Sequence, residues 1–172
     1  MLKFLGSIMV LGGCLGLGLW YRAQMDGRIK ALRNLENILE LLSSEVRYGR
    51  ASLPECCSHA ARFLAPPFDA AFQEIGRRME ENSGMAFGEV FREEMAEGLT
   101  GLPLKEKDRE DFLQFTLRTG FMDSQMQLKA MEQSMALIRN TQEKLTQEHA
   151  EKCRMALGLG AMSGLLLILI LC

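Results

Sequence analysis

The chain has 172 residues, of which 48% are hydrophobic and 24% charged, and its formal net charge is −2 at pH 7. This slightly acidic balance argues against a nucleic-acid partner, because nucleic-acid binding normally requires a basic patch or stripe. The hydrophobic residues are unevenly placed: an uncharged apolar segment lies at each end of the chain, and a charged region lies between the two.

The first apolar segment covers residues 4–21 and is bounded by Lys3 and Arg22. As a helix it would be about 27 Å long, enough to cross the hydrocarbon core of a bilayer. Trp20 and Tyr21 occupy the position of an interfacial aromatic belt. The sequence therefore predicts an N-terminal transmembrane helix at residues 4–21.

The same segment allows a second interpretation, as a signal peptide. Leu11-Gly12-Gly13-Cys14 resembles the lipidation site of bacterial lipoproteins, which would make the chain a lipid-anchored or extracytoplasmic scaffold. A lipidated cysteine normally ends the apolar stretch, however, and here the stretch continues through Trp20. The transmembrane interpretation is therefore favoured.

Between the two segments, apolar residues recur every three or four positions, which indicates helices. The first helix carries this spacing from Met25 to Val46 and is expected to end at Gly49. The sequence SLPE at residues 52–55 has capping-box spacing, so a short helix is expected from there to about Leu64.

Four further helices follow in chain order. Pro66 and Pro67 precede the third helix, and residues 82–84 form a turn before a fourth helix that ends near Gly98. A fifth helix is expected from about Lys105 to Thr119, and its charged run KEKDRED is expected to face solvent. Asp123 can cap a sixth helix, which nothing interrupts before the second apolar segment.

The second apolar segment, residues 156–172, is also uncharged and has the core sequence LLLILIL. It predicts a C-terminal transmembrane helix. No segment alternates in the manner of a strand. We therefore expect an all-α protein with a bundle of about six helices at residues 22–155, flanked by an N-terminal and a C-terminal transmembrane helix.

Basic residues near the two segments predict the orientation of the domain. They lie almost entirely on its side, with only Lys3 on the other side. The domain is therefore expected in the cytosol and the protein in the cell membrane. The basic residues are Arg22, Arg28, Lys30, Arg33, Arg139, Lys144, Lys152 and Arg154.

Each apolar segment contains a G-x-x-x-G motif, Gly12 to Gly16 and Gly160 to Gly164. Small residues one turn apart allow close packing of membrane helices, so these glycines are candidate positions for membrane helix packing. The alternative is that glycine is simply common in membrane helices. If the packing interpretation holds, the chain could act as a scaffold assembled through its anchors.

Candidate chemistry is sparse. His59 and His149 have no partner at metal-ligand spacing, and the chain has no phosphate-binding loop and no nucleophile elbow. The adjacent Cys56 and Cys57 have no C-x-x-C spacing and are expected to be free, buried thiols. We therefore expect no catalytic residue, no metal and no cofactor, and a protein that is not an enzyme.

Four stretches share the pattern of one known family. They are the start MLKFLGSIMVLGG, the closing LGLGAMSGLLLILIL, Leu42-x-x-Glu45-Val46-x-Tyr48-Gly49 followed by Leu53-Pro54-Glu55, and Gly120-x-x-Asp123-x-x-x-Gln127. Along nearly its whole length the chain resembles the stage III sporulation protein AB family. It departs from the family pattern at Met122, where Ser is usual, and at Phe87, where Trp is expected.

The resemblance implies a cytosolic helical bundle similar to the cytoplasmic domain of the type II secretion inner-membrane platform protein. It implies a place in the mother-cell membrane around the forespore, in a channel or secretion-like complex required for sporulation. The implied partners are a stage III sporulation AA-type secretion ATPase, other stage III sporulation A-operon membrane proteins and membrane lipid. The implied role is a platform or adaptor for the ATPase.

The resemblance also marks five positions: Glu45, Gly49, Gly120, Asp123 and Gln127. Each is expected to serve in a cap, a turn or packing, with direct contact to a partner as the alternative.

Overall fold

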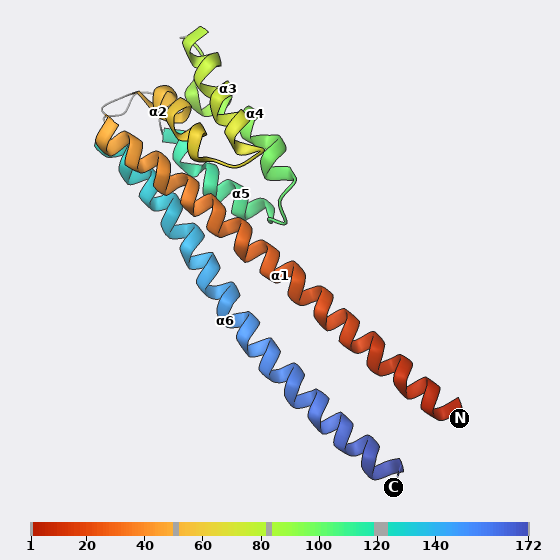
Figure 1. Cartoon of the computed structure of the whole chain (residues 1–172). Coiled ribbons are helices and arrows are strands. Elements are labelled where there is room, and N and C mark those ends of the chain that lie inside the picture. The colour runs from red at the N-terminus through yellow and green to blue at the C-terminus, as the bar shows by residue number, and fades with distance from the viewer. Residues whose placement is uncertain (1, 50–51, 82–83, 119–123, 172) are drawn as a thin grey trace. The chain divides into compact units, whose positions relative to one another are not determined.

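A computed structural model describes the backbone of residues 2–49, 52–81, 84–118 and 124–171. It describes the side chains of residues 24–49, 52–81, 84–117 and 124–148. These residues form six α-helices and two 3₁₀ turns, with no strand among them, so the all-α prediction is confirmed (Figure 1). The elements are α1 (Leu2–Gly49), α2 (Leu53–Ala60), η1 (Ala61–Phe63), α3 (Phe68–Glu81), α4 (Phe87–Thr100), α5 (Glu106–Leu113), η2 (Gln114–Arg118) and α6 (Ser124–Leu171).

The chain divides into two compact units, which we describe separately. The first contains residues 1–29 and 142–172, and its described backbone is helical. The predicted membrane segments 4–21 and 156–172 belong to this unit, but their side chains lie outside the described residues. Among the residues that are described, no helix is both long enough and apolar enough to span a bilayer. The membrane helices and the domain boundaries therefore stay predictions.

The second unit, residues 30–141, is a helical bundle. The periodic face of α1 lies in its core, with Leu32, Leu35, Leu39 and Leu42 fully buried. From α6, Met131 and Ile138 are buried as well. The helical spacing of apolar residues thus correctly predicted which face of α1 is buried.

Within this unit, ion pairs join α1 and α6 in antiparallel order. Arg139 Nε donates a hydrogen bond to Glu36 Oε1 over 2.9 Å, and Arg47 Nη2 donates one to Glu132 Oε1 over 3.2 Å. Glu36 is only 9% exposed, so its pairing offsets the cost of removing a carboxylate from water. As residue numbers rise along α1, the paired numbers fall along α6.

The middle helices are held by close backbone approach and by aromatic rings. A Cβ on Gly76 of α3 would lie 1.9 Å from Ser58 Oγ and 3.3 Å from the Pro54 carbonyl oxygen of α2, so α2 and α3 cross closely at this glycine. Phe91 of α4 contacts four other rings, with centroid distances of 5.2 to 6.2 Å. These rings belong to Phe72, Phe87, Phe112 and Phe115, so Phe91 links α3, α4, α5 and η2.

The fifth predicted helix needs correction in two respects. It is not a single helix from Lys105 to Thr119, because α5 ends at Leu113 and continues as the 3₁₀ turn η2. There the Thr116 hydroxyl donates a hydrogen bond to the Leu113 carbonyl over 2.7 Å, offering that carbonyl a local partner. The charged run also does not lie wholly in solvent: Asp108 is 2% exposed and accepts the backbone N–H of Lys105 over 2.9 Å.

Candidate functional site

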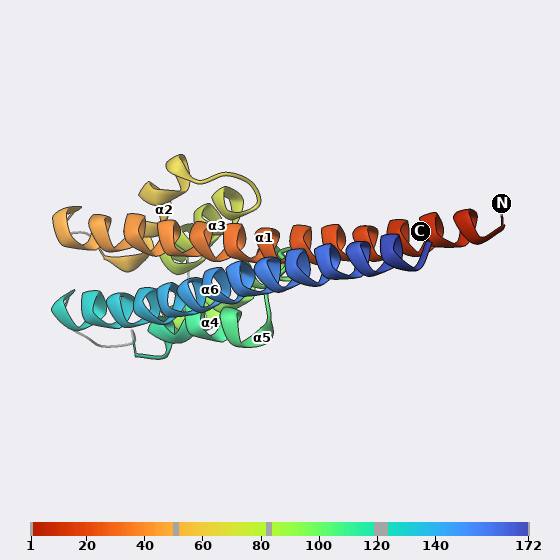
Figure 2. The same ribbon diagram turned by 90° about the horizontal axis from the view of Figure 1, so that it is seen from below.

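One end of the second unit gathers the last turn of α1, the turn η2 and the first turn of α6. We call it the motif end and define it as residues 45–49, 114–118 and 124–127. The antiparallel pairing of α1 and α6 brings the end of one helix to the start of the other, and η2 ends shortly before α6 begins. Figures 1 and 2 both show these three elements converging on the same side of the bundle.

Three of the five family-pattern positions can be placed, and all three belong to the motif end. Glu45 is half-buried, and its Oε2 lies 3.6 Å from His59 Nδ1 of α2. Gly49 is the last residue of α1, as predicted, and is exposed, whereas Gln127 is half-buried in α6. Gly120 and Asp123 lie outside the described residues, so their turn and cap roles stay predictions.

The motif end also exposes large apolar side chains. Tyr48 is 80% exposed, Leu117 is 69% exposed and Met126 is 56% exposed. Single exposed apolar residues are normal on a protein surface. Here three of them, from three different elements, lie at one end of the bundle. Such a cluster indicates a surface for protein contact, since aromatic residues and Met are enriched in protein interfaces.

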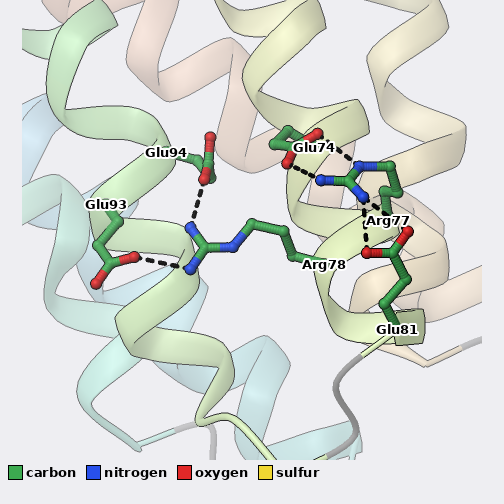
Figure 3. A network of polar contacts seen from close by, with 6 residues as sticks. All are labelled: Glu74, Arg77, Arg78, Glu81, Glu93 and Glu94. Carbon is green, nitrogen blue, oxygen red and sulfur yellow. Dashed lines mark hydrogen bonds and ion pairs between the residues drawn. The ribbon is translucent and has the colours of Figure 1, made fainter.

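A network of charged side chains joins α3 to α4 on another part of the bundle (Figure 3). Arg78 donates hydrogen bonds to both Glu93 and Glu94, and Arg77 to both Glu74 and Glu81. The hydrogen bond from Arg77 lowers the pKa of Glu74, and the one to Glu94 raises the pKa of Arg78. These shifts favour the charged forms, so the network suits a fixed polar surface better than proton transfer.

The prediction of free, buried thiols is confirmed for the two cysteines whose side chains are described. Cys56 and Cys57 are both buried, and neither is in a disulfide. Burial raises the pKa of Cys56 to about 11, and it raises the pKa of Cys57 as well. Both thiols are therefore protonated near neutral pH, which makes them poor nucleophiles.

Other predicted positions are only partly covered by the structure. His59 is exposed, and the described residues contain no group of side chains arranged to hold a metal ion. Gly12, Gly16, Gly160 and Gly164 lie in helical backbone, but their packing partners lie outside the described residues. Their role in membrane helix packing stays a prediction.

Sequence reasoning missed several side chains that organise the bundle. Arg78 and its two glutamates are 15 and 16 residues apart along the chain, a separation that no local pattern reveals. Asp108 had a usable signal, since it stands at the third position of α5, where a carboxylate can accept the N–H of the preceding cap residue. The charges around it obscured that signal.

The fold first defines the class: an all-helical bundle whose first and last helices, α1 and α6, are each 48 residues long. The solved structure of a Stage III sporulation protein AB (SpoIIIAB) has a similar fold, with a TM-score of 0.61 and 20% sequence identity. The alignment covers 72% of this chain and 97% of that one.

The sequence then identifies the family. The profile of the family described as Stage III sporulation protein AB matches residues 3–172. The Stage III sporulation protein AB of Bacillus subtilis (strain 168) is 26% identical over 171 residues, which cover 99% of each chain. The chain therefore belongs to the stage III sporulation protein AB family, and the resemblance predicted from its motifs is confirmed.

Proposed function

We propose that this chain is a non-enzymatic membrane component of the sporulation machinery, a platform or adaptor for a secretion-type ATPase. The ATPase is the stage III sporulation AA-type protein, and the complex is the channel between mother cell and forespore. Family membership supports the role in sporulation. The two apolar segments, 4–21 and 156–172, support membrane anchoring, with the bundle in the cytosol.

The observation that carries the adaptor role is the composition of the motif end. It combines three family-pattern positions with exposed Tyr48, Leu117 and Met126. Covering exposed apolar side chains with a partner lowers the free energy of the complex. Aromatic residues often contribute most to such contacts. The ATPase therefore docks at the motif end, with Tyr48 as the central contact.

A binding experiment tests this proposal. The full chain in lipid nanodiscs is titrated with the purified ATPase, and Kd is measured for the unmodified chain, for Tyr48→Ala and for Phe63→Ala. Phe63 is a matched control, because it is 72% exposed but lies in η1, outside the motif end. We expect Tyr48→Ala to raise Kd at least about 10-fold, or about 1.4 kcal/mol, and Phe63→Ala to leave it unchanged.

Two results would contradict the proposal. If the unmodified full chain does not bind the ATPase, the adaptor role is wrong, and a lipid-anchored or extracytoplasmic scaffold becomes the better interpretation. If the unmodified chain binds the ATPase and Tyr48→Ala binds it with the same Kd, the adaptor role survives, but the motif end is the wrong surface.

A further inference from the structure

Three exposed side chains follow one another at three-residue steps along the first turns of α6. They are Met126, Lys129 and Glu132. Residues three apart are neighbours on a helix surface, so the three side chains form one continuous ridge that begins within the motif end. The ridge therefore places a cation directly beside an apolar side chain of the proposed ATPase contact.

Lys129 has one acidic residue within four positions on its own helix, Glu132. A Lys and a Glu three residues apart on a helix can form an ion pair. Here another cation uses the carboxylate, because Arg47 Nη2 of α1 donates a hydrogen bond to Glu132 Oε1 over 3.2 Å. Among the residues whose side chains are described, Lys129 forms no ion pair. The pairing of α1 with α6 thus leaves the ammonium group of Lys129 available to a partner.

The ion pair between Arg47 and Glu132 also brings the apolar part of the surface close to Lys129. Tyr48 follows Arg47 in the last turn of α1, and Met126 precedes Lys129 by about one turn of α6. Tyr48 and Met126 are both exposed. The end of α1 and the start of α6 therefore offer a partner two apolar side chains with an unpaired cation beside them.

The charge around the motif end is slightly positive, although the whole chain carries a formal net charge of −2. Residues 45–50 and 114–132 contain four basic and three acidic residues. The bundle itself already engages two of the three carboxylates: Arg47 binds Glu132, and Glu45 Oε2 lies 3.6 Å from His59 Nδ1. An acidic partner is therefore attracted to this surface more than a basic one. The basic residues are Arg47, Arg50, Arg118 and Lys129, and the acidic ones are Glu45, Asp123 and Glu132.

The partner that matches this surface has two chemical features. Its apolar groups cover Tyr48 and Met126, and a carboxylate meets the Lys129 ammonium at the edge of the contact. Charges at such an edge determine partner choice and the association rate more than the affinity. A nucleic acid normally needs a basic patch or stripe, which the acidic residues interrupt here. The observations therefore favour an acidic protein surface.

We propose that the ATPase surface that covers the motif end carries an Asp or Glu side chain, and that Lys129 selects the partner by binding this carboxylate. This inference rests on the proposed function, which assigns the motif end to the ATPase. It adds that the electrostatic part of the recognition comes from Lys129, while Tyr48 supplies the apolar contact.

Charge reversal tests the role of Lys129. The full chain in nanodiscs of zwitterionic lipid is titrated with the purified ATPase. Kd is measured for the unmodified chain, Lys129→Gln, Lys129→Glu and Arg33→Glu. Arg33 is the matched control, because it is exposed and precedes Glu45 by 12 residues, about 18 Å along α1. Its substitution makes the same change in net charge as Lys129→Glu, but away from the motif end.

We expect Lys129→Gln to raise Kd about 3-fold and Lys129→Glu to raise it at least about 10-fold. The first removes an exposed ion pair, and the second places like charges together. Arg33→Glu should leave Kd unchanged. Raising the ionic strength from about 0.1 M to about 1 M shortens the Debye length from about 10 Å to about 3 Å, so it should reduce the effect of Lys129→Glu. Equal Kd values for Lys129→Glu and the unmodified chain would overturn the proposal.

Carbodiimide crosslinking identifies the partner carboxylate. The reagent joins an amine to a carboxylate in direct contact, forming an amide with loss of water, and mass spectrometry locates the joined residues. We expect Lys129 to be joined to an Asp or Glu of the ATPase. Changing that residue to Lys should restore binding to Lys129→Glu, which also shows that this variant is folded. Crosslinks from the ATPase only to other lysines of the chain contradict a contact at Lys129.

Failure of this inference and failure of the proposed function give different results. If the unmodified chain does not bind the ATPase, the adaptor role itself is wrong. If Tyr48→Ala weakens binding but Lys129→Glu does not, the adaptor role and the motif end survive, and only the assignment of Lys129 is wrong.

Discussion

Ser134 lies on the face of α6 that points into the bundle, with only 1% of its surface exposed. Its hydroxyl has no hydrogen-bond partner among the described residues. A buried hydroxyl without a partner loses its hydrogen bonds to water on folding and gains nothing in return. Ser134 therefore lowers the free energy of unfolding relative to an apolar residue of similar size.

We expect Ser134→Ala to stabilise the protein by about 1–2 kcal/mol, because it removes the unpaired hydroxyl and leaves an apolar contact. Ser43→Ala on α1 is the matched control. It brings the same gain in helix propensity, but it removes a hydroxyl that already bonds to the Glu40 carbonyl over 2.9 Å. Urea unfolding in detergent gives both values. A destabilised Ser134→Ala variant would show that this hydroxyl has a partner after all.

At the scale of elements, close approach of backbones decides how α4 meets η2. A Cβ on Gly88 would lie 2.6 Å from the backbone carbonyl oxygen of Thr116, closer than real Cβ contacts come. A backbone atom cannot swing away as a flexible side chain can, so the two elements would have to separate. The aromatic contacts of Phe91 with Phe112 and Phe115 lie at the same junction.

We therefore expect Gly88→Ala to destabilise the fold by about 1–3 kcal/mol, even though alanine favours a helix by about 1 kcal/mol relative to glycine. Gly84→Ala is the control, since nothing lies within 4 Å of its Cβ position. Thermal unfolding followed by circular dichroism compares the two variants. An equal or higher melting temperature for Gly88→Ala would show that α4 and η2 can move apart at no cost.

Prediction from the sequence succeeded where a signal is local and failed where it depends on distant residues. The spacing of Leu32, Leu35 and Leu39 identified the buried face of α1, because a helix repeats on its own. The change from α5 to the 3₁₀ turn η2 was missed, and there the backbone of Thr116 approaches Gly88, which is 28 residues away along the chain.

The candidate site was predicted in the same partial way. Family patterns marked Glu45, Gly49 and Gln127, but nothing in the sequence showed that the end of α1, with Tyr48, lies beside the start of α6, with Met126. That grouping follows from the antiparallel pairing of α1 with α6, through ion pairs between residues 85 and 103 positions apart. Periodicity predicts the face of a single helix but not its partner.

At the scale of the whole molecule, the proposed function assigns the motif end to a protein partner. The motif end offers an aromatic and two aliphatic side chains for this contact. This assignment needs the bundle on the cytosolic side of the membrane, where an ATPase can reach it. The orientation of the chain is therefore the central claim.

Cysteine labelling in intact sporulating cells tests that orientation most directly. Cys14, Cys153 and Cys172 are replaced by serine, and Glu80→Cys places a reactive thiol at an exposed position of α3. The parent chain, which keeps buried Cys56 and Cys57, gives the background. With a membrane-impermeant maleimide, we predict labelling of position 80 only after lysis. Labelling of intact cells would place the bundle outside the cytosol and contradict the adaptor role.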